Sequence, residues 1–370
     1  MRRYDLDSLR VIVFGLLIFY HVGMFFVPWE NHIKDVQTYE GLVFPMLFVN
    51  QWRLSILFVI SGMGTYYALS KRSAVEFAKE RIRRLLIPLI VGMLFIVPPQ
   101  VYYERLDKGQ FYGNYFDFWP MKAFIGTYPE GNLSWHHLWF LPYLLIFSLI
   151  LIPVFLYLRK HPDNWGIQKL QLISSKRFGL YIFAIPLFLW EFTLAPYYPS
   201  THALFGDWNN LVGYCTLFFF GYLLISLKDV FWDTVIRNRH IYLFGGLIGF
   251  PLLMILWFNI DDFSGKLYIS ALVKVFNLWS WILAIFGYAA TYLNKPSRTL
   301  AYANESVYPL YILHQTVIVI LGYYLKYTDL GFFAKFTLMV IGTFGFSWLI
   351  YEYAIRPYSW IRPLFGLKNK

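Results

Sequence analysis

The chain contains about ten apolar stretches, each close to the roughly 20 residues that an α-helix needs to cross a bilayer. Hydrophobic residues make up 58% of its 370 positions and charged residues only 14%, which is more apolar surface than a water-soluble fold of this length can bury. The expected spans are, approximately, residues 10–28, 50–69, 85–103, 137–158, 178–195, 210–227, 241–259, 268–292, 306–325 and 332–354. The sequence therefore predicts an all-α, polytopic membrane helix bundle, integral to the plasma membrane, or to the inner membrane in a cell with two.

Basic residues gather in alternate connections between these spans. The second, fourth and sixth connections carry Lys71, Arg72, Lys79, Arg81, Arg83, Arg84, Arg159, Lys160, Lys169, Lys176, Arg177, Arg237 and Arg239. By the positive-inside rule, both termini are predicted to be cytoplasmic, because basic residues also precede the first span and follow the last. Topology thus explains the net charge of +11, and we expect no nucleic-acid partner.

The longest hydrophilic stretch, from about Glu104 to His136, is too short to form a separate soluble domain. The sequence therefore predicts a single integral membrane domain over residues 1–370. This stretch and the next outer loop are rich in aromatic residues, which are Tyr112, Tyr115, Phe116, Trp119, Trp135, Tyr197, Tyr198 and Trp208. They are typical of a membrane-interface belt, and they could also stack against the rings of a sugar acceptor.

Arg10 begins the first apolar run and His21 lies deep inside it. Eleven residues of helix place both side chains on nearly the same face, about 16 Å apart along the axis. Ionisable groups inside a membrane are costly and usually functional, although Arg10 could simply anchor the helix at the interface and His21 could simply bond a neighbouring helix. We predict that the two residues serve the two ends of one elongated ligand.

A neutral imidazole at this depth has the chemistry of a general base. His21 could take a proton from a hydroxyl that attacks a thioester and return it to the leaving thiol. Such a reaction also needs a group that stabilises the oxyanion, and Arg53, His137 and Tyr311 are the candidates. The order among these three stays open.

The basic run of Arg81, Arg83 and Arg84 lies at the cytoplasmic mouth of the third span. It is either a topology anchor or a clamp that binds the phosphates of a donor such as coenzyme A, with help from Arg10. The adjacent His136 and His137 point about 100° apart on a helix, and no metal-binding pattern completes them. We therefore expect no metal and no permanently bound cofactor.

Four segments, in order and spacing, resemble the signatures of the acyltransferase 3 family of integral membrane acyltransferases. They are residues 3–10 followed by His21, residues 52–62 (WRLSILFVISG), residues 137–141 (HLWFL) and residues 308–314 (YPLYILH). The first three are most similar to the branch of this family that succinylates glucans.

The resemblance implies that acyl-CoA, either acetyl-CoA or succinyl-CoA, is the cytoplasmic donor and that the acceptor is a hydroxyl of an exported or cell-envelope glycan. It implies that His21 is the base and that Arg10 and the basic run bind the donor, although the family's two arginines are separated by three residues and these stand at 81, 83 and 84. The predicted site residues are therefore His21, Arg10 and His314 for catalysis, Arg10, Arg81, Arg83 and Arg84 for the donor, and Arg53, His137, Trp139 and Tyr311 for the substrate.

The alternative function is a membrane transporter or exporter of a glycan or glycolipid, whose path the buried polar groups would line. A non-enzymatic scaffold is a third hypothesis, but it gives no reason to keep a costly histidine in the membrane. The identity of the acyl group, the acceptor and the oligomeric state, a homo-oligomer included, stay open.

Overall fold

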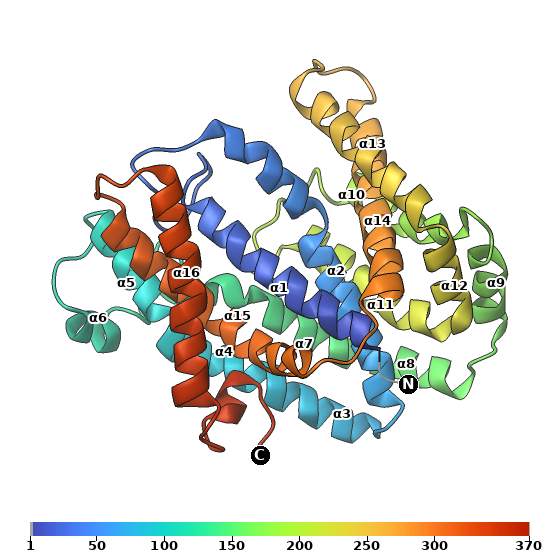
Figure 1. The fold of residues 1–370 in the computed structure, drawn as a ribbon, viewed down its shortest axis with the longest axis horizontal. Helices are drawn as coiled ribbons and strands as arrows, with labels where there is room; N and C mark the ends of the chain where they lie inside the picture. Colours follow the sequence, from blue (N-terminus) through green and yellow to red (C-terminus); the bar gives the residue numbers. More distant parts are fainter. Residues whose placement is uncertain (1–2, 370) are drawn as a thin grey trace. The chain divides into compact units, whose positions relative to one another are not determined.

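The structure is a computed structural model that describes residues 3–369. It divides into two compact units: unit 1 holds the described residues of 1–10, 48–79 and 146–297, and unit 2 those of 11–47, 80–145 and 298–370. Four helices, α1 (Tyr4–Met24), α2 (Val43–Leu69), α3 (Ala74–Arg81) and α7 (Phe140–Ile150), begin in one unit and end in the other. Residues 3–369 form helices and connecting loops, with no β-strand among them (Figure 1). A single domain over residues 1–370 stays a prediction.

Unit 1 is built from long apolar helices and shorter ones, which bury large aromatic side chains. In addition to most of α2, its helices are α8 (Ile152–Lys160), α9 (Trp165–Ser174), α10 (Ala184–Thr193), α11 (Trp208–Ser226), α12 (Asp229–Arg237), α13 (Arg239–Phe258) and α14 (Lys266–Tyr292). Helices α13 and α14 pack along each other (Figure 1). The fully buried indole of Trp279 on α14 donates to the Leu180 carbonyl at 2.8 Å, which satisfies its N–H group.

Glycine allows two helices of unit 1 to touch through their backbones. A Cβ atom at Gly62 of α2 would lie 1.9 Å from the Phe218 carbonyl oxygen of α11, and one at Gly221 of α11 would lie 2.0 Å from the Val59 carbonyl oxygen of α2. Small residues that face each other in this way are the usual means of close helix packing in membranes.

Unit 2 contains the remaining helices. Besides most of α1, they are α4 (Ile87–Val91), α5 (Pro98–Asp107), α6 (Tyr115–Met121), the first half of α7 (Phe140–Ile150), α15 (Arg298–Leu325) and α16 (Phe332–Ile350). Helix α3 (Ala74–Arg81) leads into this unit and continues to α5 as one 34-residue path, interrupted by π-helical turns at Ile82–Leu86 and Gly92–Ile96. Turns of this kind are frequent at functional sites.

The apolar core of unit 2 joins the end of α1 to α15 and α16. Phe25 and Phe26 are almost fully buried and pack with Ile318, Val319 and Met339. The ion pair between Lys335 and Asp35, at 2.7 Å, is buried beside this core and satisfies both charges. These contacts hold the part of α1 that carries His21 against α15.

The predicted polytopic helical fold is confirmed, with a smaller number of clear spans. Within residues 3–369, eight helices are long and apolar enough to cross a membrane, or nine if the pair His136–Ile150 and Ile152–Lys160, bent by 47°, is one span. The span expected at 178–195 is a 3-10 turn, Gly179–Phe183, followed by the ten-residue α10. At 1.5 Å per residue, α10 covers only about half of a bilayer core.

Candidate active site

The predicted site residues divide between the two units. Unit 1 contains Arg10 and Arg53, and unit 2 contains His21, Arg81, Arg83, Arg84, His137, Trp139, Tyr311 and His314. Within unit 2, three histidines from three different helical segments lie together. The ring centroids of His21 and His314 are 5.0 Å apart, and those of His137 and His314 are 5.2 Å apart.

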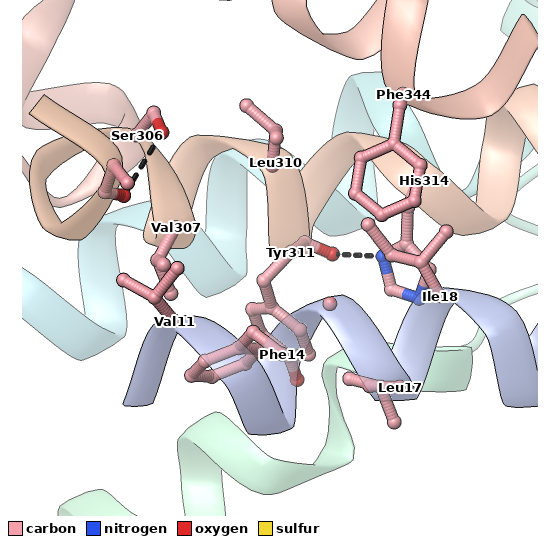
Figure 2. Close-up of a pocket in the computed structure, with 12 residues that line it drawn as sticks. Val11, Phe14, Leu17, Ile18, Ser306, Val307, Leu310, Tyr311, His314 and Phe344 are labelled. Atoms are coloured by element: carbon pink, nitrogen blue, oxygen red, sulfur yellow. Dashed lines mark hydrogen bonds between the residues drawn. The ribbon is translucent and has the colours of Figure 1, made fainter. Parts of the chain in front are cut away.

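A hydrogen bond joins the first two of these histidines. Nδ1 of His21, on α1, lies 2.8 Å from Nε2 of His314, on α15. The other ring nitrogen of His314, Nδ1, lies 2.6 Å from the backbone oxygen of Tyr311 (Figure 2). His314 is fully buried, whereas His21 is only partly buried.

The carbonyl of Tyr311 fixes the tautomers of the pair. A carbonyl oxygen only accepts, so Nδ1 of His314 carries its hydrogen and, in the neutral ring, Nε2 is an acceptor. Nδ1 of His21 must then donate to it. The proton of neutral His21 thus sits on Nδ1, and Nε2 is the basic nitrogen. This is the arrangement of a base that a second group orients.

His137 is held in a different tautomer by its own partners. Its Nε2 lies 3.0 Å from the Ile312 carbonyl oxygen and so carries the hydrogen, while Nδ1 faces the side-chain amide of Gln100 at 3.4 Å. That amide also donates to the hydroxyl of Thr316 at 2.8 Å, and Thr316 donates to the Ile96 carbonyl at 2.6 Å. A polar network thus fixes His137 beside His314.

Tyr311 and Trp139 lie in the aromatic surroundings of this network. The hydroxyl of Tyr311 donates to the His137 carbonyl at 2.7 Å, and its ring is 6.0 Å from that of His314. The ring of Trp139 is 5.2 Å from that of Tyr143. His137 and Tyr311 therefore donate to backbone carbonyls here, and their roles toward an oxyanion or a substrate stay predictions.

A cavity of about 200 Å³ lies within unit 2 and ends at His314. Figure 2 shows Phe14, Leu17 and Ile18 on α1 at one side and Leu310 and Tyr311 on α15 at another. The complete lining is Val11, Phe14, Gly15, Leu17, Ile18, Ala303, Ser306, Val307, Leu310, Tyr311, His314 and Phe344. It is almost entirely apolar and contains no lysine or arginine side chain.

The basic run lies where α3 passes into the first π-helical turn. Arg84 donates from Nε to the Gly366 carbonyl at 3.1 Å, and its own carbonyl accepts from the Tyr308 hydroxyl at 2.7 Å. Arg83 is exposed, and Arg81 is partly buried. The C-terminal loop therefore orients Arg84, while Arg83 faces outward, and the choice among the three arginines for donor binding stays open.

A second polar cluster in unit 2 surrounds Glu104 of α5. This fully buried carboxylate accepts from His32 Nδ1 and Lys108 Nζ, both at 2.6 Å, and from the Tyr128 hydroxyl at 3.1 Å. Burial and the neighbouring carboxylate raise the pKa of Tyr128 well above its usual value, so this hydroxyl stays protonated as a donor. His136, the neighbour of His137 in the chain, packs edge-to-face against His32, with ring centroids 4.3 Å apart.

The two predicted residues of unit 1 have partners of their own. Arg10 is one-third exposed and lies 3.4 Å from Asp7. Arg53 is buried on α2 and donates to Asn50 at 3.3 Å. Burial lowers the pKa of the nearby His202; the Asp207 carboxylate opposes this shift, and the guanidinium of Arg53 adds to it. Their roles toward donor and acceptor stay predictions.

Sequence reasoning missed Gln100 and Thr316 in the polar network and His32 and Glu104 in the second polar cluster. Gln100 is an isolated amide in an apolar run, which is a signal that could have been used, because such a group needs an internal partner in a membrane. His32 and Glu104 are 72 residues apart, and only the fold shows that they pair. No group of three or more His, Cys, Asp or Glu side chains among residues 3–369 is arranged to hold a metal ion.

Comparison with known proteins shows the family of the chain. A family model described as an acyltransferase domain matches residues 3–352. The chain belongs to the acyltransferase 3 family. It is an integral, multi-pass membrane acyltransferase.

Relatives of this acyltransferase include the glucans biosynthesis protein C of Escherichia coli K12, which is 22% identical over 368 residues, with 96% of this chain and 92% of the relative covered. The protein of the same name from E. coli O1:K1 / APEC is also 22% identical, over 372 residues with the same coverage. No solved structure matches the chain.

Proposed function

We propose that this acyltransferase moves an acyl group from cytoplasmic acyl-CoA to a hydroxyl of an exported or cell-envelope glycan, with His21 as the general base. The observation that carries the proposal is the hydrogen bond between His21 and His314, because it leaves Nε2 of a partly exposed histidine unprotonated. A base for an alcohol needs such a nitrogen within reach of the hydroxyl.

The reaction needs one proton to be moved twice. Nε2 of His21 takes the hydroxyl proton as the oxygen attacks the thioester carbonyl, which forms the carbon–oxygen bond. The carbon–sulfur bond then breaks, and the same nitrogen returns the proton to the thiolate as it leaves as free CoA thiol. His314 accepts from Nδ1 of His21 throughout and stabilises the imidazolium between the two steps. No net proton and no electron are consumed.

The donor is an acyl-CoA, for which the family resemblance gives acetyl-CoA and succinyl-CoA as candidates, and the run of Arg81, Arg83 and Arg84 binds its phosphates. Guanidinium groups bind phosphate in a bidentate manner, and the exposed Arg83 is available for such contacts. The name of the E. coli relatives, glucans biosynthesis protein C, supports a glucan as acceptor. Exposed Tyr112, Phe116 and Tyr197 offer flat surfaces for sugar rings.

The experiment is release of free CoA thiol by the purified protein in lipid nanodiscs, with acetyl-CoA and succinyl-CoA offered separately beside mixed oligosaccharides. The His21→Ala variant is expected to lose activity by at least 10²-fold, as for the loss of a general base. The control is His240→Ala, because His240 is exposed in unit 1 and bonds Tyr288. Equal thiol release by wild type and His21→Ala would refute the assignment of the base.

A further inference from the structure

The cavity beside His314 indicates which acyl chains the donor carries, an inference that rests on the proposed function. We propose that this cavity holds the acyl chain of the donor, and that the preferred donors carry uncharged aliphatic chains longer than acetyl. Succinyl-CoA would then be a poor donor, although the sequence resemblance favours the succinylating branch of the family.

Position is the first argument. His314 forms one end of the cavity, and His314 bonds His21, whose ring centroid is only 5.0 Å away. A thioester carbonyl attacked beside Nε2 of His21 therefore lies near the end of the cavity that His314 forms. From there the cavity continues along α1 and α15 as far as Val11 and Ser306 (Figure 2).

The chemistry of the lining is the second argument. Its polar hydrogens already have acceptors in the protein: Ser306 donates to the Ala303 carbonyl at 2.9 Å, and Tyr311 donates to the His137 carbonyl at 2.7 Å. His314 uses its ring nitrogens toward Tyr311 and His21. A carboxylate here would be buried without a cation or a donor, which is strongly unfavourable. The amides of a pantetheine arm would also lack partners.

Size is the third argument. An apolar cavity of about 150 Å³ accommodates benzene, so about 200 Å³ has room for roughly six to eight carbon atoms. Acetyl would leave most of this volume empty. Burial of each further methylene is worth about a fourfold gain in binding, so butanoyl and hexanoyl groups should be used better than acetyl.

Gly15 and Phe344 allow the cavity to be made smaller or larger. A Cβ atom at Gly15 would meet no other atom within 4 Å, so the side chain in Gly15→Val would extend into the cavity. Phe344→Ala would remove a wall of the cavity from α16. Gly345 also has no atom within 4 Å of a Cβ and does not line the cavity, so Gly345→Val is a matched control.

The test measures kcat/KM in nanodiscs for acetyl-, butanoyl-, hexanoyl-, decanoyl- and succinyl-CoA. Butanoyl-CoA and succinyl-CoA have the same chain length, and we expect wild type to use the former at least tenfold better. In Gly15→Val the ratio of hexanoyl to acetyl transfer should fall at least tenfold. In Phe344→Ala the ratio of decanoyl to hexanoyl transfer should rise, and Gly345→Val should keep the wild-type ratios.

Other outcomes would overturn the inference in distinguishable ways. Succinyl-CoA used as well as butanoyl-CoA would exclude an apolar acyl site. If Gly15→Val reduced the use of every donor in the same proportion, the cavity would hold a part common to all donors, such as the pantetheine arm. Acetyl transfer with ratios unchanged in both variants would refute the cavity assignment alone. No transfer from any donor by wild type would refute the proposed function as well.

Discussion

At the scale of single residues, the central feature is the imidazole of His21, because its hydrogen-bond partner determines which ring nitrogen carries the hydrogen. The carbonyl of Tyr311 fixes His314, and His314 fixes the hydrogen of His21 on Nδ1. His314 therefore acts as a positioning residue through His21. A positioning role requires a hydrogen-bond acceptor opposite Nδ1 of His21, whereas a packing role requires only a side chain of similar volume.

Substitutions of His314 separate these two roles. We expect His314→Ala to reduce kcat of thiol release by about 10²-fold or more, while KM for the donor changes little, because orientation of the base is lost. His314→Gln supplies an amide oxygen that can accept from Nδ1 of His21, and it should recover part of kcat. A Gln variant as inactive as the Ala variant would contradict the positioning role.

Position 366 requires glycine, because its backbone conformation and its close contacts exclude a side chain. Its φ is +70°, and a Cβ there would lie 1.8 Å from a ring carbon of Tyr308. Gly366→Ala should displace Tyr308 and the adjacent Arg84, which bonds both residues. We expect a loss of about 2 kcal/mol in the free energy of unfolding, measured by denaturation in detergent micelles.

The control for Gly366→Ala is Gly331→Ala, because Gly331 has a φ of −70° and no atom within 4 Å of a Cβ. This control should change the unfolding free energy by less than about 0.5 kcal/mol, as for an ordinary surface substitution. Equal stabilities of the two variants would show that the Tyr308 contact does not hold the C-terminal loop.

At the scale of helices, close crossing through glycine organises unit 1. Gly62→Ala would force a methyl group against the Phe218 carbonyl, so α2 and α11 must separate. The expected cost is about 1–3 kcal/mol, measured by thermal unfolding of the purified protein. Gly64→Ala, on the same helix with open space around its Cβ, should instead be neutral or stabilising. The reverse order of stability would contradict this crossing.

The helical elements also explain which parts of the site could be predicted from sequence. His21, His137 and His314 stand out as ionisable groups in apolar runs, and the structure brings them together. Their pairing could not be predicted, because it depends on α1 and α15 lying side by side, and apolar helix surfaces do not specify their neighbours. The hydrogen bond between Gln100 and Thr316 likewise depends on which helices pack together.

At the scale of the whole molecule, hydropathy predicted the helical membrane fold because span length is set by the bilayer. The ten expected spans exceed the eight long apolar helices of residues 3–369 where helices are bent or short: α7 and α8 meet at 47°, and Pro153 lies in the first turn of α8. Eight spans would place both termini on one side of the membrane and nine would place them on opposite sides. The prediction that both are cytoplasmic therefore requires the bent pair and the short Gly179–Thr193 segment to cross together or not at all.

Transfer of an acyl group from the cytoplasmic face to an acceptor on the other side of the bilayer can be measured in sealed inside-out vesicles. Acyl-CoA with a labelled acyl group is added outside, at the cytoplasmic face, and oligosaccharide is enclosed inside with wild type, His21→Ala or His240→Ala in the membrane. We expect labelled oligosaccharide in the lumen for wild type and His240→Ala, with at least a 10²-fold loss for His21→Ala. Label on the enclosed oligosaccharide at the wild-type level in His21→Ala vesicles would contradict the central role of His21.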